Sequence, residues 1–552
     1  MSSSLKPTNN LVTPLCTDLY QITMAYGYWR CDKHNDEVVF DAFFRKAPFK
    51  GQYCIFAGSD EILRFVASFK YSESDIEYLK TILLNKEEAF WEWLASIDCS
   101  DVRVYCMKQG EFVFPREPIV VVEGPLAIVQ LLETTILNLI NFACLVATNA
   151  RRLKTCASQP STKSRLRPVK PLKMLEFGLR RAQGPDGGYS ASKYSILGGF
   201  DASSNVICGK IDKIPIVGTM AHSFITSFTG FSQSKSIPIV RKGTSYQTDF
   251  VPFVLNAQEK VVAVFGNTHN IGELCAFASF AAGFPEKFIA LVDSFDTLKS
   301  GMLNFFIVGL ALVELGYLPI GLRLDSGDLA KLSIECRKMC IRMDAAAAAA
   351  DDAVIFSDCN IAVSNDINED SLQKMIEDGH EIDTYAVGTN LVTCQKQPAL
   401  GCVYKLVEIN STPRIKLSEE AEKTTIPGKK RVYRLYGAEN KPLLDVLLRE
   451  GEPVPVAGQR LLVRDPFDET ARVYVTPTKV EPLLHLLWSK EISVVDIPDL
   501  FEAKAYCQKN FDTFPAAVTR CVNAEPFRVG VSSIMYDHLH RMILENTPID
   551  EL

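Results

Sequence analysis

The feature that most constrains the fold is a short apolar run that recurs six times between residues 172 and 390 and stops each time at a polar cluster. The six segments read LKMLEFGLRRAQG, IPIVGTMAHS, FIALVDSFD, IGLRLDSGD, AVIFSDCN and TYAVGTN. In a β/α barrel, apolar strands alternate with helices, and the loops after the strands gather around one site. The recurrence therefore predicts an α/β fold with an irregular, TIM-like β/α barrel and an active site at the carboxyl ends of its strands.

The length of 552 residues exceeds what one hydrophobic core holds, since cores stop growing at about 250 to 300 residues. We expect an α+β sandwich domain over residues 1–150, the barrel over 151–395, and a return to the sandwich sheet with a carboxyl-terminal peripheral region over 396–552. Half-buried antiparallel strands are expected at Glu37–Phe44 and within Val102–Val122, where apolar and polar residues alternate. Further strands are expected at Val403–Ile409 and Arg431–Tyr436.

Charge and composition exclude several classes of protein. The net charge of −7 disfavours binding to nucleic acid, so any phosphate must be held by local cations. Four polar residues interrupt the apolar stretch Leu126–Ala147, which indicates a buried or interface helix rather than a membrane span. The cysteines are scattered without a CxxC pair, the histidines do not cluster as zinc ligands, and no signal peptide is apparent, which together predict a cytosolic protein.

The segment Arg323-Leu-Asp325-Ser326-Gly327-Asp328 closes one predicted strand and opens a helix. Arg323 can pair in a bidentate manner with a carboxylate or phosphate, and Asp325 and Asp328 can hold sugar hydroxyls or hydrated magnesium. Ser326 and Gly327 place backbone amides at a turn that can hold an anion. The alternative is a helix cap beside an ion pair, but two acids and an arginine exceed what capping requires.

Other candidate residues follow neighbouring strands. His222 stands at a strand end, where it can act as an acid, a base or a phosphate acceptor rather than as a core histidine. Phe177 and Arg180 offer an aromatic face and a guanidinium to a flat anionic ring, although a core phenylalanine beside a solvated arginine remains the alternative. Gly388 and Thr389 stand where barrels bind phosphate, and ordinary turn chemistry explains them equally well.

Two connecting segments bear on access to this site. The stretch Gln159–Lys173 is rich in Pro, Lys, Arg and Ser and is interpreted as a surface connector. Thr229–Val251 follows the His222 cluster and is either a mobile lid or a passive surface loop. The common nucleotide signatures are missing: neither GxxxxGK[ST] nor a helix-opening GxGxxG occurs, so a nucleotide must be bound in another way.

Several long motifs resemble those of the eukaryotic nicotinate phosphoribosyltransferases, over about residues 11–440. They are DLYQITMAYGYW (18–29), LEFGLRRAQGPDGG (175–188), LGGFDASSNV (197–206), GTMAHSFITSF (218–228), LRLDSGDL (322–329) and VGTN (387–390). The resemblance implies a type II phosphoribosyltransferase of NAD biosynthesis, a homodimer with shared active sites. It implies that nicotinate and phosphoribosyl diphosphate become nicotinate mononucleotide and diphosphate, with Mg²⁺ (or Mn²⁺) and with ATP as co-substrate.

The same resemblance implies roles in a pyridine pocket. Tyr20 is similar to the tyrosine that covers the pyridine ring from across the dimer, and Phe177 to the ring on its other face. Thr219 and Arg323 resemble contacts of nicotinate, and Arg180 an arginine near the substrate carboxylate or phosphate.

For the phosphate-bearing substrates, the resemblance implies that His222 is phosphorylated by ATP. Asp293, Asp325 and Asp328 resemble residues that handle ribose hydroxyls and the metal ion. Gly388 and Thr389 resemble residues that bind the phosphate of the phosphoribosyl group.

Two other functions remain open. A nicotinamide-using relative shares the barrel and the histidine, but a neutral amide favours a carboxylate acceptor, whereas an anionic ring favours cations. We expect the acid as substrate because Arg180 and Arg181 are present and because Ser203, Ser204 and Asn205 are expected near the site. A barrel that binds phosphate without turnover is the second alternative.

Overall fold

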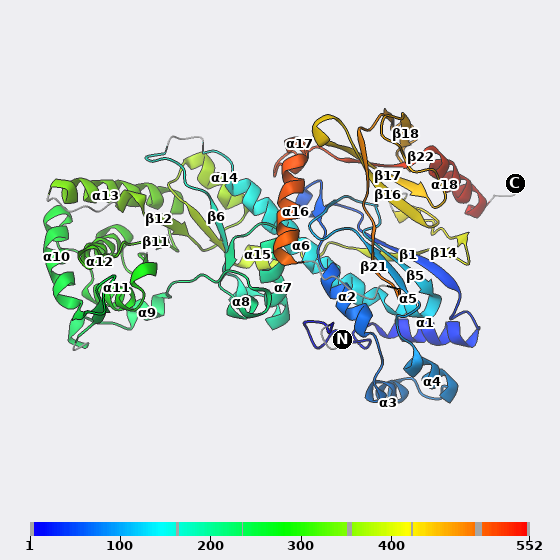
Figure 1. Cartoon of the computed structure of the whole chain (residues 1–552), viewed down its shortest axis with the longest axis horizontal. Helices are drawn as coiled ribbons and strands as arrows, with labels where there is room; N and C mark the ends of the chain where they lie inside the picture. Colours follow the sequence, from blue (N-terminus) through cyan, green and yellow to red (C-terminus); the bar gives the residue numbers. More distant parts are fainter. Residues whose placement is uncertain are drawn as a thin grey trace. The chain divides into compact units, whose positions relative to one another are not determined.

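The computed structural model describes residues 5–161, 165–233, 236–349, 356–420, 423–491 and 499–548. The chain divides into two units (Figure 1). Unit 1 combines Met1–Arg151, Lys193–Gly199 and Cys394–Leu552, and unit 2 combines Arg152–Ser192 and Phe200–Thr393. The six apolar runs therefore fall in unit 2.

The first sheet of unit 1 has the order β15-β14-β1-β5-β3-β21 and is antiparallel throughout. Its strands are β1 (Glu37–Phe43), β3 (Arg103–Cys106), β5 (Val120–Pro125), β14 (Val403–Ile409), β15 (Thr412–Pro413) and β21 (His485–Trp488). The expected strands at Glu37–Phe44, within Val102–Val122 and at Val403–Ile409 are confirmed. Because β14 pairs with β1, the chain does return to its first sheet after unit 2.

Strand β1 departs from the half-buried pattern that we expected, because Val38 to Phe43 are all buried. On one face Val39 packs with Val121 and Val407. On the other face Phe40 stacks on Tyr404, whose hydroxyl donates a hydrogen bond to the carbonyl oxygen of Val129 in α5 (Leu126–Leu131). Both faces of the strand are thus covered. The alternation of apolar and polar residues in its sequence therefore does not predict which of its side chains are exposed.

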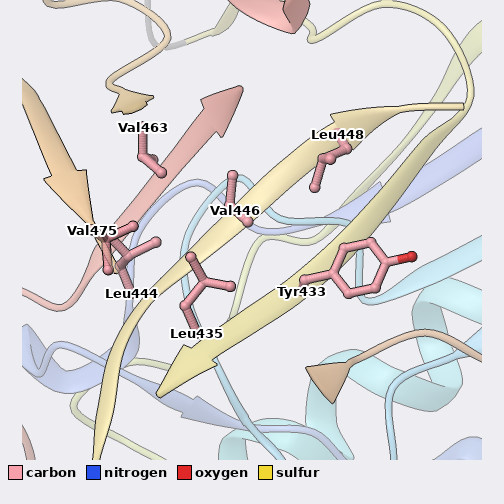
Figure 2. Packing of buried hydrophobic residues seen from close by; sticks show 7 residues of the cluster. All are labelled: Tyr433, Leu435, Leu444, Val446, Leu448, Val463 and Val475. Atoms are coloured by element: carbon pink, nitrogen blue, oxygen red, sulfur yellow. The ribbon is translucent and has the colours of Figure 1, made fainter. Parts of the chain in front are cut away.

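The second sheet of unit 1 has the order β19-β18-β22-β17-β16-β20. Its strands are β16 (Lys430–Tyr436), β17 (Pro442–Arg449), β18 (Leu461–Arg464), β19 (Arg472–Val475), β20 (Lys479–Pro482) and β22 (Arg528–Ser532). A cluster of side chains from four of these strands forms a core on one face (Figure 2): Tyr433, Leu435, Leu444, Val446, Leu448, Val463 and Val475. The strand expected at Arg431–Tyr436 is present, but in this second sheet.

The helices of unit 1 lie mainly near the two ends of the chain. They are α1 (Leu19–Arg30), α2 (Ser59–Ser68), α3 (Glu73–Ile82), α4 (Glu88–Ser96), α5 (Leu126–Leu131), α16 (Leu500–Thr513), α17 (Ala516–Thr519) and α18 (Ser533–Asn546), and a short hairpin joins β2 (Cys54–Ile55) to β4 (Phe112–Val113). Helix α6 (Glu133–Ala157) follows α5 directly. By length and composition alone, Leu126–Ala157 and Thr297–Glu314 could each span a membrane, yet most of each apolar window is buried inside the structure. The expectation of a buried helix at Leu126–Ala147 is confirmed.

Unit 2 is built on a parallel sheet with the order β10-β11-β12-β13-β6-β7. Its strands are β6 (Lys173–Glu176), β7 (Ala202–Ser203), β10 (Ile289–Leu291), β11 (Gly321–Leu324), β12 (Asn360–Val363) and β13 (Thr384–Val387). A parallel bridge from Ser203 to Ile216 adds one further backbone segment to the sheet, beside β7. Within the described residues no strand pairing joins Ile216 to β10, so hydrogen bonds do not close the ring of strands. The predicted α/β class with a parallel strand array is confirmed.

Helices connect the parallel strands, as the strand-to-strand crossovers require. They are α7 (Gly184–Leu197), α8 (Val206–Asp212), α9 (His222–Thr226), α10 (Val251–Phe265), α11 (Ile271–Gly283), α12 (Met302–Glu314), α13 (Leu329–Ala349), α14 (Glu369–Asp378) and α15 (Thr389–Thr393). Between α9 and α10 the chain forms a hairpin of β8 (Pro238–Val240) and β9 (Gln247–Asp249). This hairpin lies within Thr229–Val251, and whether the segment acts as a lid stays a prediction.

Two expectations about unit 2 are wrong. The run AVIFSDCN is not a strand where the structure describes it, because Phe356–Asp358 forms a 3-10 turn and the strand follows at Asn360–Val363; residues 353–355 lie outside the described residues. Phe356 packs edge-on against Phe305 and Phe306 of α12, so its apolar character serves helix packing. The run that begins near Pro215 contributes only the bridge at Ile216.

The predicted surface connector Gln159–Lys173 is only partly at the surface. The side chains of Arg165 and Arg167 are 12% and 7% exposed, and both form ion pairs with the buried carboxylate of Asp383 at the start of β13. Arg337 of α13 pairs with the same carboxylate at 3.1 Å. The basic residues therefore anchor the connector to the sheet instead of facing solvent.

Candidate active site

The carboxyl ends of adjacent parallel strands place the predicted polar residues at one edge of the unit 2 sheet. Asp293 follows β10, Asp325 follows β11, Phe177 follows β6 and Gly388 follows β13. Because β10, β11, β12, β13 and β6 are neighbours in that order, these residues come from four of five consecutive strands along the edge. The edge therefore gathers residues that lie more than 200 positions apart in the chain.

His222 and Asp293 form the first contact of the site. His222 is the first residue of α9, and its Nε2 lies 3.0 Å from Oδ1 of Asp293. The histidine side chain is 44% exposed, whereas the carboxylate is 2% exposed. When Nε2–H donates to the carboxylate, the neutral ring carries its lone pair on Nδ1, and the carboxylate stabilises the ring if it becomes positively charged.

The second oxygen of Asp293 connects this pair to the segment after β11. Its Oδ2 accepts hydrogen bonds from the backbone amide of Asp325 at 3.2 Å and from Oγ of Ser326 at 2.5 Å. Gly327 has a positive φ of 80°, which lets the backbone turn sharply between Ser326 and the start of α13. Asp293 is thus held from two sides and presents a fixed acceptor to His222.

Arg323 is held in place by groups from three strand ends. Its Nη2 lies 3.0 Å from Oδ1 of Asp325, and its Nε donates to Oγ of Ser364 at 2.8 Å. Ser364 in turn donates to Asp325. The guanidinium carbon lies 5.6 Å from the centre of the Phe177 ring, within the range of a cation–π contact. The remaining guanidinium N–H groups are available to bind an anion beside the phenylalanine ring.

The ends of β6 and β13 approach each other closely near Phe177. The amide of Phe177 donates to the carbonyl oxygen of Val387 at 2.8 Å. A side chain at Gly178 would collide with Val392 of α15, so glycine is needed there for this approach. Gly388 and Thr389 are half-buried on the same connection, at the start of α15.

Thr219 and Arg180 also belong to unit 2. Unlike Arg323, neither is held in place by several neighbouring side chains in the described part of the chain. Within the described residues, Oγ1 of Thr219 is buried without a hydrogen-bond partner, and so is Oγ of Ser294, the residue after Asp293. Buried hydroxyls are normally hydrogen-bonded, so an unpaired hydroxyl is consistent with a place for a ligand. Arg180 is exposed in a 3-10 turn, Leu179–Arg181.

The acidic residues of the site do not form a cage for a metal ion. No group of three His, Cys, Asp or Glu side chains that could hold a metal occurs in the described part of the chain. Oδ1 of Asp325 is engaged by Arg323 and Ser364, while Oδ1 of Asp328 accepts a hydrogen bond from the amide of Lys331. Mg²⁺ that is carried by substrate phosphates needs only one or two carboxylates, so the exposed Asp328 and the outer face of Asp325 fit that mode and not a protein cage.

Two buried carboxylates belong to the surroundings of the site and were not anticipated. Glu273 of α11 accepts hydrogen bonds from Oγ of Ser300 at 2.5 Å and from Nδ2 of Asn304 at 2.9 Å. Burial raises the pKa of Glu273 to about 7, against the opposing effect of these two donors, and the charges of Asp293 and Asp296 add to the increase. No periodic pattern distinguishes this glutamate from any other acid in a helix.

Glu176, the last residue of β6, is the second such carboxylate. It accepts hydrogen bonds from Ser192, Ser203 and the amide of Gly178. Asn205 donates to Ser192 at 3.1 Å. Ser203 and Asn205, which we expected near the substrate, therefore take part in this buried network, and they no longer support the choice between an acid and an amide.

Tyr20 belongs to unit 1, where it lies on α1 with its side chain 48% exposed. Its proposed action on the pyridine ring stays a prediction.

Comparison with known proteins identifies proteins that are similar to this chain. A family model described as the nicotinate phosphoribosyltransferase N-terminal domain matches residues 15–141, and one described as the C-terminal domain matches residues 429–539. Both matched ranges lie outside the parallel sheet. Longer similarity includes that sheet: nicotinate phosphoribosyltransferase 1 of Arabidopsis thaliana is 46% identical over 556 residues, covering 99% of this chain and 96% of the relative.

Nicotinate phosphoribosyltransferase of Homo sapiens is 43% identical over 526 residues, covering 94% of each chain. Among solved structures, the human nicotinic acid phosphoribosyltransferase matches with a TM-score of 0.84 at 38% identity, covering 95% of this chain and 99% of that chain. A nicotinate-nucleotide pyrophosphorylase from Pyrococcus furiosus matches with a TM-score of 0.59 at 18% identity, covering 92% of this chain and 97% of that chain, which reports a shared fold.

Proposed function

Because the chain belongs to the nicotinate phosphoribosyltransferase family, we propose that it joins nicotinate to 5-phosphoribosyl 1-diphosphate, forming nicotinate mononucleotide and diphosphate for NAD synthesis. The observation that carries the proposal is the continuous set of contacts from His222 through Asp293 to Ser326, beside Arg323 and Asp325. A phosphate acceptor, a fixed carboxylate and an anion-binding guanidinium thus share one edge of one sheet.

Nicotinate is proposed to bind with its ring against Phe177 and its carboxylate on Arg323. The contact between the Arg323 guanidinium and the Phe177 ring places a cation next to an aromatic face, as a flat anionic ring requires. The unpaired hydroxyl of Thr219 is a further donor for the substrate. In a homodimer, Tyr20 would cover the other face of the ring, and Arg180 would approach a carboxylate or phosphate.

The chemistry of the site follows from the charges that develop. As diphosphate leaves the anomeric carbon of the ribose, positive charge grows on the sugar, and nearby carboxylates such as Asp325 stabilise that charge. The nitrogen of nicotinate then forms the new bond to the anomeric carbon. A Mg²⁺ ion bound with the substrate phosphates would neutralise charge on the leaving diphosphate. Gly388 and Thr389, at the end of β13, are proposed to hold the 5-phosphate through backbone amides.

Coupling to ATP is proposed to pass through His222. Nδ1 attacks the γ-phosphorus of ATP, the bond to the β-phosphate oxygen breaks, and ADP leaves. Asp293 accepts a hydrogen bond from Nε2–H and stabilises the positively charged ring during the transfer. The phosphohistidine then places additional negative charge near the diphosphate site, which changes the affinity for substrate and product until water removes the phosphoryl group.

The choice of nicotinate over nicotinamide rests on charge. In the described part of the site the two acceptors beside Arg323 and His222 are already engaged, Asp325 by Arg323 and Asp293 by His222. A buried carboxylate of the substrate that meets the free donors of the Arg323 guanidinium is stabilised, whereas a neutral amide offers these donors no negative charge, a difference of several kcal/mol.

The direct test measures product formation from nicotinate or nicotinamide with phosphoribosyl diphosphate and magnesium, with and without ATP. We expect nicotinate to be used more than 100-fold better than nicotinamide, since an unpaired buried charge costs several kcal/mol. Equal use of both would overturn the assignment of substrate. Binding of phosphoribosyl diphosphate without release of diphosphate would instead indicate a non-catalytic barrel.

A variant, His222→Asn, tests the coupling. We expect it to lose ATP hydrolysis and the phosphohistidine while slow transfer without ATP continues, because the bond-forming step does not require the histidine. The half-buried His34 of unit 1, changed to Asn in the same way, is the matched control. ATP hydrolysis that continues undiminished in His222→Asn would contradict the role of this residue.

A further inference from the structure

A second cationic site occurs in unit 1, in residues that the proposed reaction does not use. A pocket of about 630 Å³ opens beside β18, β19 and β22. Its lining includes six cationic residues: Arg45, Lys46, Arg116, Arg464, Arg472 and Arg528. Asp465 is the one acidic residue in the recorded lining, and its Oδ1 already accepts hydrogen bonds from the amides of Phe467 and Asp468. The pocket thus carries a strong excess of positive charge.

One arginine of the lining, Arg464, has neighbours that hold its guanidinium in place. The guanidinium carbon of Arg464 lies 3.5 Å from the centre of the Tyr536 ring, and the ring centres of Tyr536 and His540 lie 4.0 Å apart with the rings tilted by 32°. The Nη1 atom of Arg464 lies 3.7 Å from the carboxylate of Asp537, which is 75% exposed and therefore a weak partner. A guanidinium fixed in this way loses little freedom when it binds an anion.

Some hydrogen-bond donors in this lining lack partners. Within the described residues, Nε of Arg464 and Nε of Arg45 are buried and make no hydrogen bond. A buried cationic donor without a partner is costly, and a bound anion removes that cost. The unpaired donors are a second observation, beyond the charge count, that points to an anionic ligand.

Much of the remaining lining is apolar. Leu444 and Val463, both labelled in Figure 2, line the pocket together with Leu447, Val473, Val529 and Val531. The volume is typical of sites for small organic ligands and far exceeds what a free phosphate ion needs. The ligand that fits has both a phosphorylated part for the arginines and an organic part for the apolar wall.

We propose that this pocket is a second ligand site, which binds a phosphorylated compound of nucleotide size. Its phosphates contact Arg464, Arg472 and Arg528, and its organic part contacts the valine and leucine side chains. The site shares no residue with the candidate active site, so the proposal stands or falls independently of the proposed reaction.

The test uses the full-length chain carrying Arg323→Ala, which removes the proposed nicotinate contact. The proposed ATP site beside His222 remains in this variant, so binding at the pocket is measured as the ADP binding that the pocket variants lose. Isothermal titration calorimetry measures binding of ADP, inorganic pyrophosphate and adenosine. At this pocket we expect one ADP per chain, weaker binding of pyrophosphate and no binding of adenosine alone. The double variant Arg472→Glu/Arg528→Glu in the same background should weaken ADP binding about 100-fold or more, at about tenfold for each lost charge-assisted contact.

The matched control is Arg460→Glu/Arg520→Glu, which changes the net charge equally at exposed positions outside the pocket lining. It should bind ADP as the background protein does, and Arg472→Lys/Arg528→Lys should retain most of the affinity. Thermal unfolding confirms that each variant is folded. Equal loss in the control, unchanged binding in the charge-reversed variant, or adenosine binding as tight as ADP would each overturn the proposal.

Discussion

At the scale of single residues, the site depends on side chains that are each held by more than one partner. Arg323 is the clearest case, because Ser364 and Asp325 hold two of its nitrogens while Phe177 covers its face. Asp293 likewise divides its two oxygens between His222 and the segment after β11. Orientation of this kind fixes the reacting groups before a substrate arrives.

The substitution Arg323→Lys removes the planar fork while keeping the charge. A single ammonium cannot reproduce the bonds to Ser364 and Asp325 and also bind a carboxylate, so we expect the KM for nicotinate to rise about 10- to 100-fold with a smaller change in kcat. Steady-state kinetics with nicotinate varied at saturating phosphoribosyl diphosphate measures this. The same change at Arg342, an exposed residue of α13, should leave KM unaffected, and an unchanged KM in Arg323→Lys would remove this arginine from the nicotinate pocket.

Glu273 makes stability depend on pH, because burial raises its pKa from an ordinary 4.5 to about 7. Between these two values the folded chain keeps a proton that the unfolded chain has lost, so the free energy of unfolding falls as the pH rises through this range. Glu273→Gln removes that dependence and should be more stable than the wild type at pH 8 by up to about 3 kcal/mol, with little difference at pH 4.5. Urea unfolding at both pH values measures this, with the exposed Glu286→Gln as control. A difference that does not change with pH would contradict the assigned pKa.

Residues that directly follow an apolar run could be predicted from the sequence. His222, Asp293, Arg323 and Asp325 were found in this way, and the structure brings them into contact. Ser364 was missed because its strand was assigned too early in the chain. Glu176 and Glu273 could not be found, because their importance comes from burial among distant partners, which no local pattern reports.

At the scale of elements, close approaches between strand ends and helix starts set the position of the site. Gly301 ends the turn Thr297–Gly301 before α12, and a side chain there would collide with the carbonyl oxygen of Val292, the residue before Asp293. Phe356 shows where a prediction from local sequence fails. Its apolar run predicts a strand, but in the structure Phe356 packs against α12. A short apolar run cannot by itself distinguish a buried strand from a helix contact.

Gly301→Ala should therefore act on the active site from a distance. The displaced backbone has to move Val292 and with it Asp293, so we expect a loss of about 1 to 3 kcal/mol in stability and of about 10- to 100-fold in kcat. Gly283→Ala in α11 is the control, because its added carbon would meet no atom within 4 Å. Thermal unfolding and turnover of nicotinate measure the two effects. Normal kcat in Gly301→Ala would show that Asp293 tolerates this displacement.

At the scale of the whole molecule, unit 1 is held together by charges as well as by its apolar cores. Arg434 of β16 is buried and makes a bidentate pair with Asp445 of β17, at 2.8 and 2.7 Å, and it also contacts Glu111 and the carbonyl oxygen of Phe112. One guanidinium thus links the second sheet to the short hairpin of β2 and β4. Burial and the charge of Asp445 raise the pKa of the neighbouring Glu117 well above its ordinary range.

Replacing this arginine should destabilise unit 1 strongly. Arg434→Met leaves two buried carboxylates without their cation, which costs about 3 to 5 kcal/mol. Arg431→Met, on the same strand but partly exposed, should cost less than about 1 kcal/mol. Denaturant unfolding of both variants tests the comparison, and equal stability of the two would show that the buried pair contributes nothing beyond packing.

The pairing of β1 with β14 has a consequence for how the protein is made. Val38 pairs with Ile409, so the ribosome adds about 370 residues after β1 before the partner strand exists. During that interval one edge of β1 has no native neighbour while the whole of unit 2 is translated. Open edges of apolar strands favour aggregation, so the nascent chain passes through a vulnerable stage that ends only when the carboxyl-terminal third emerges.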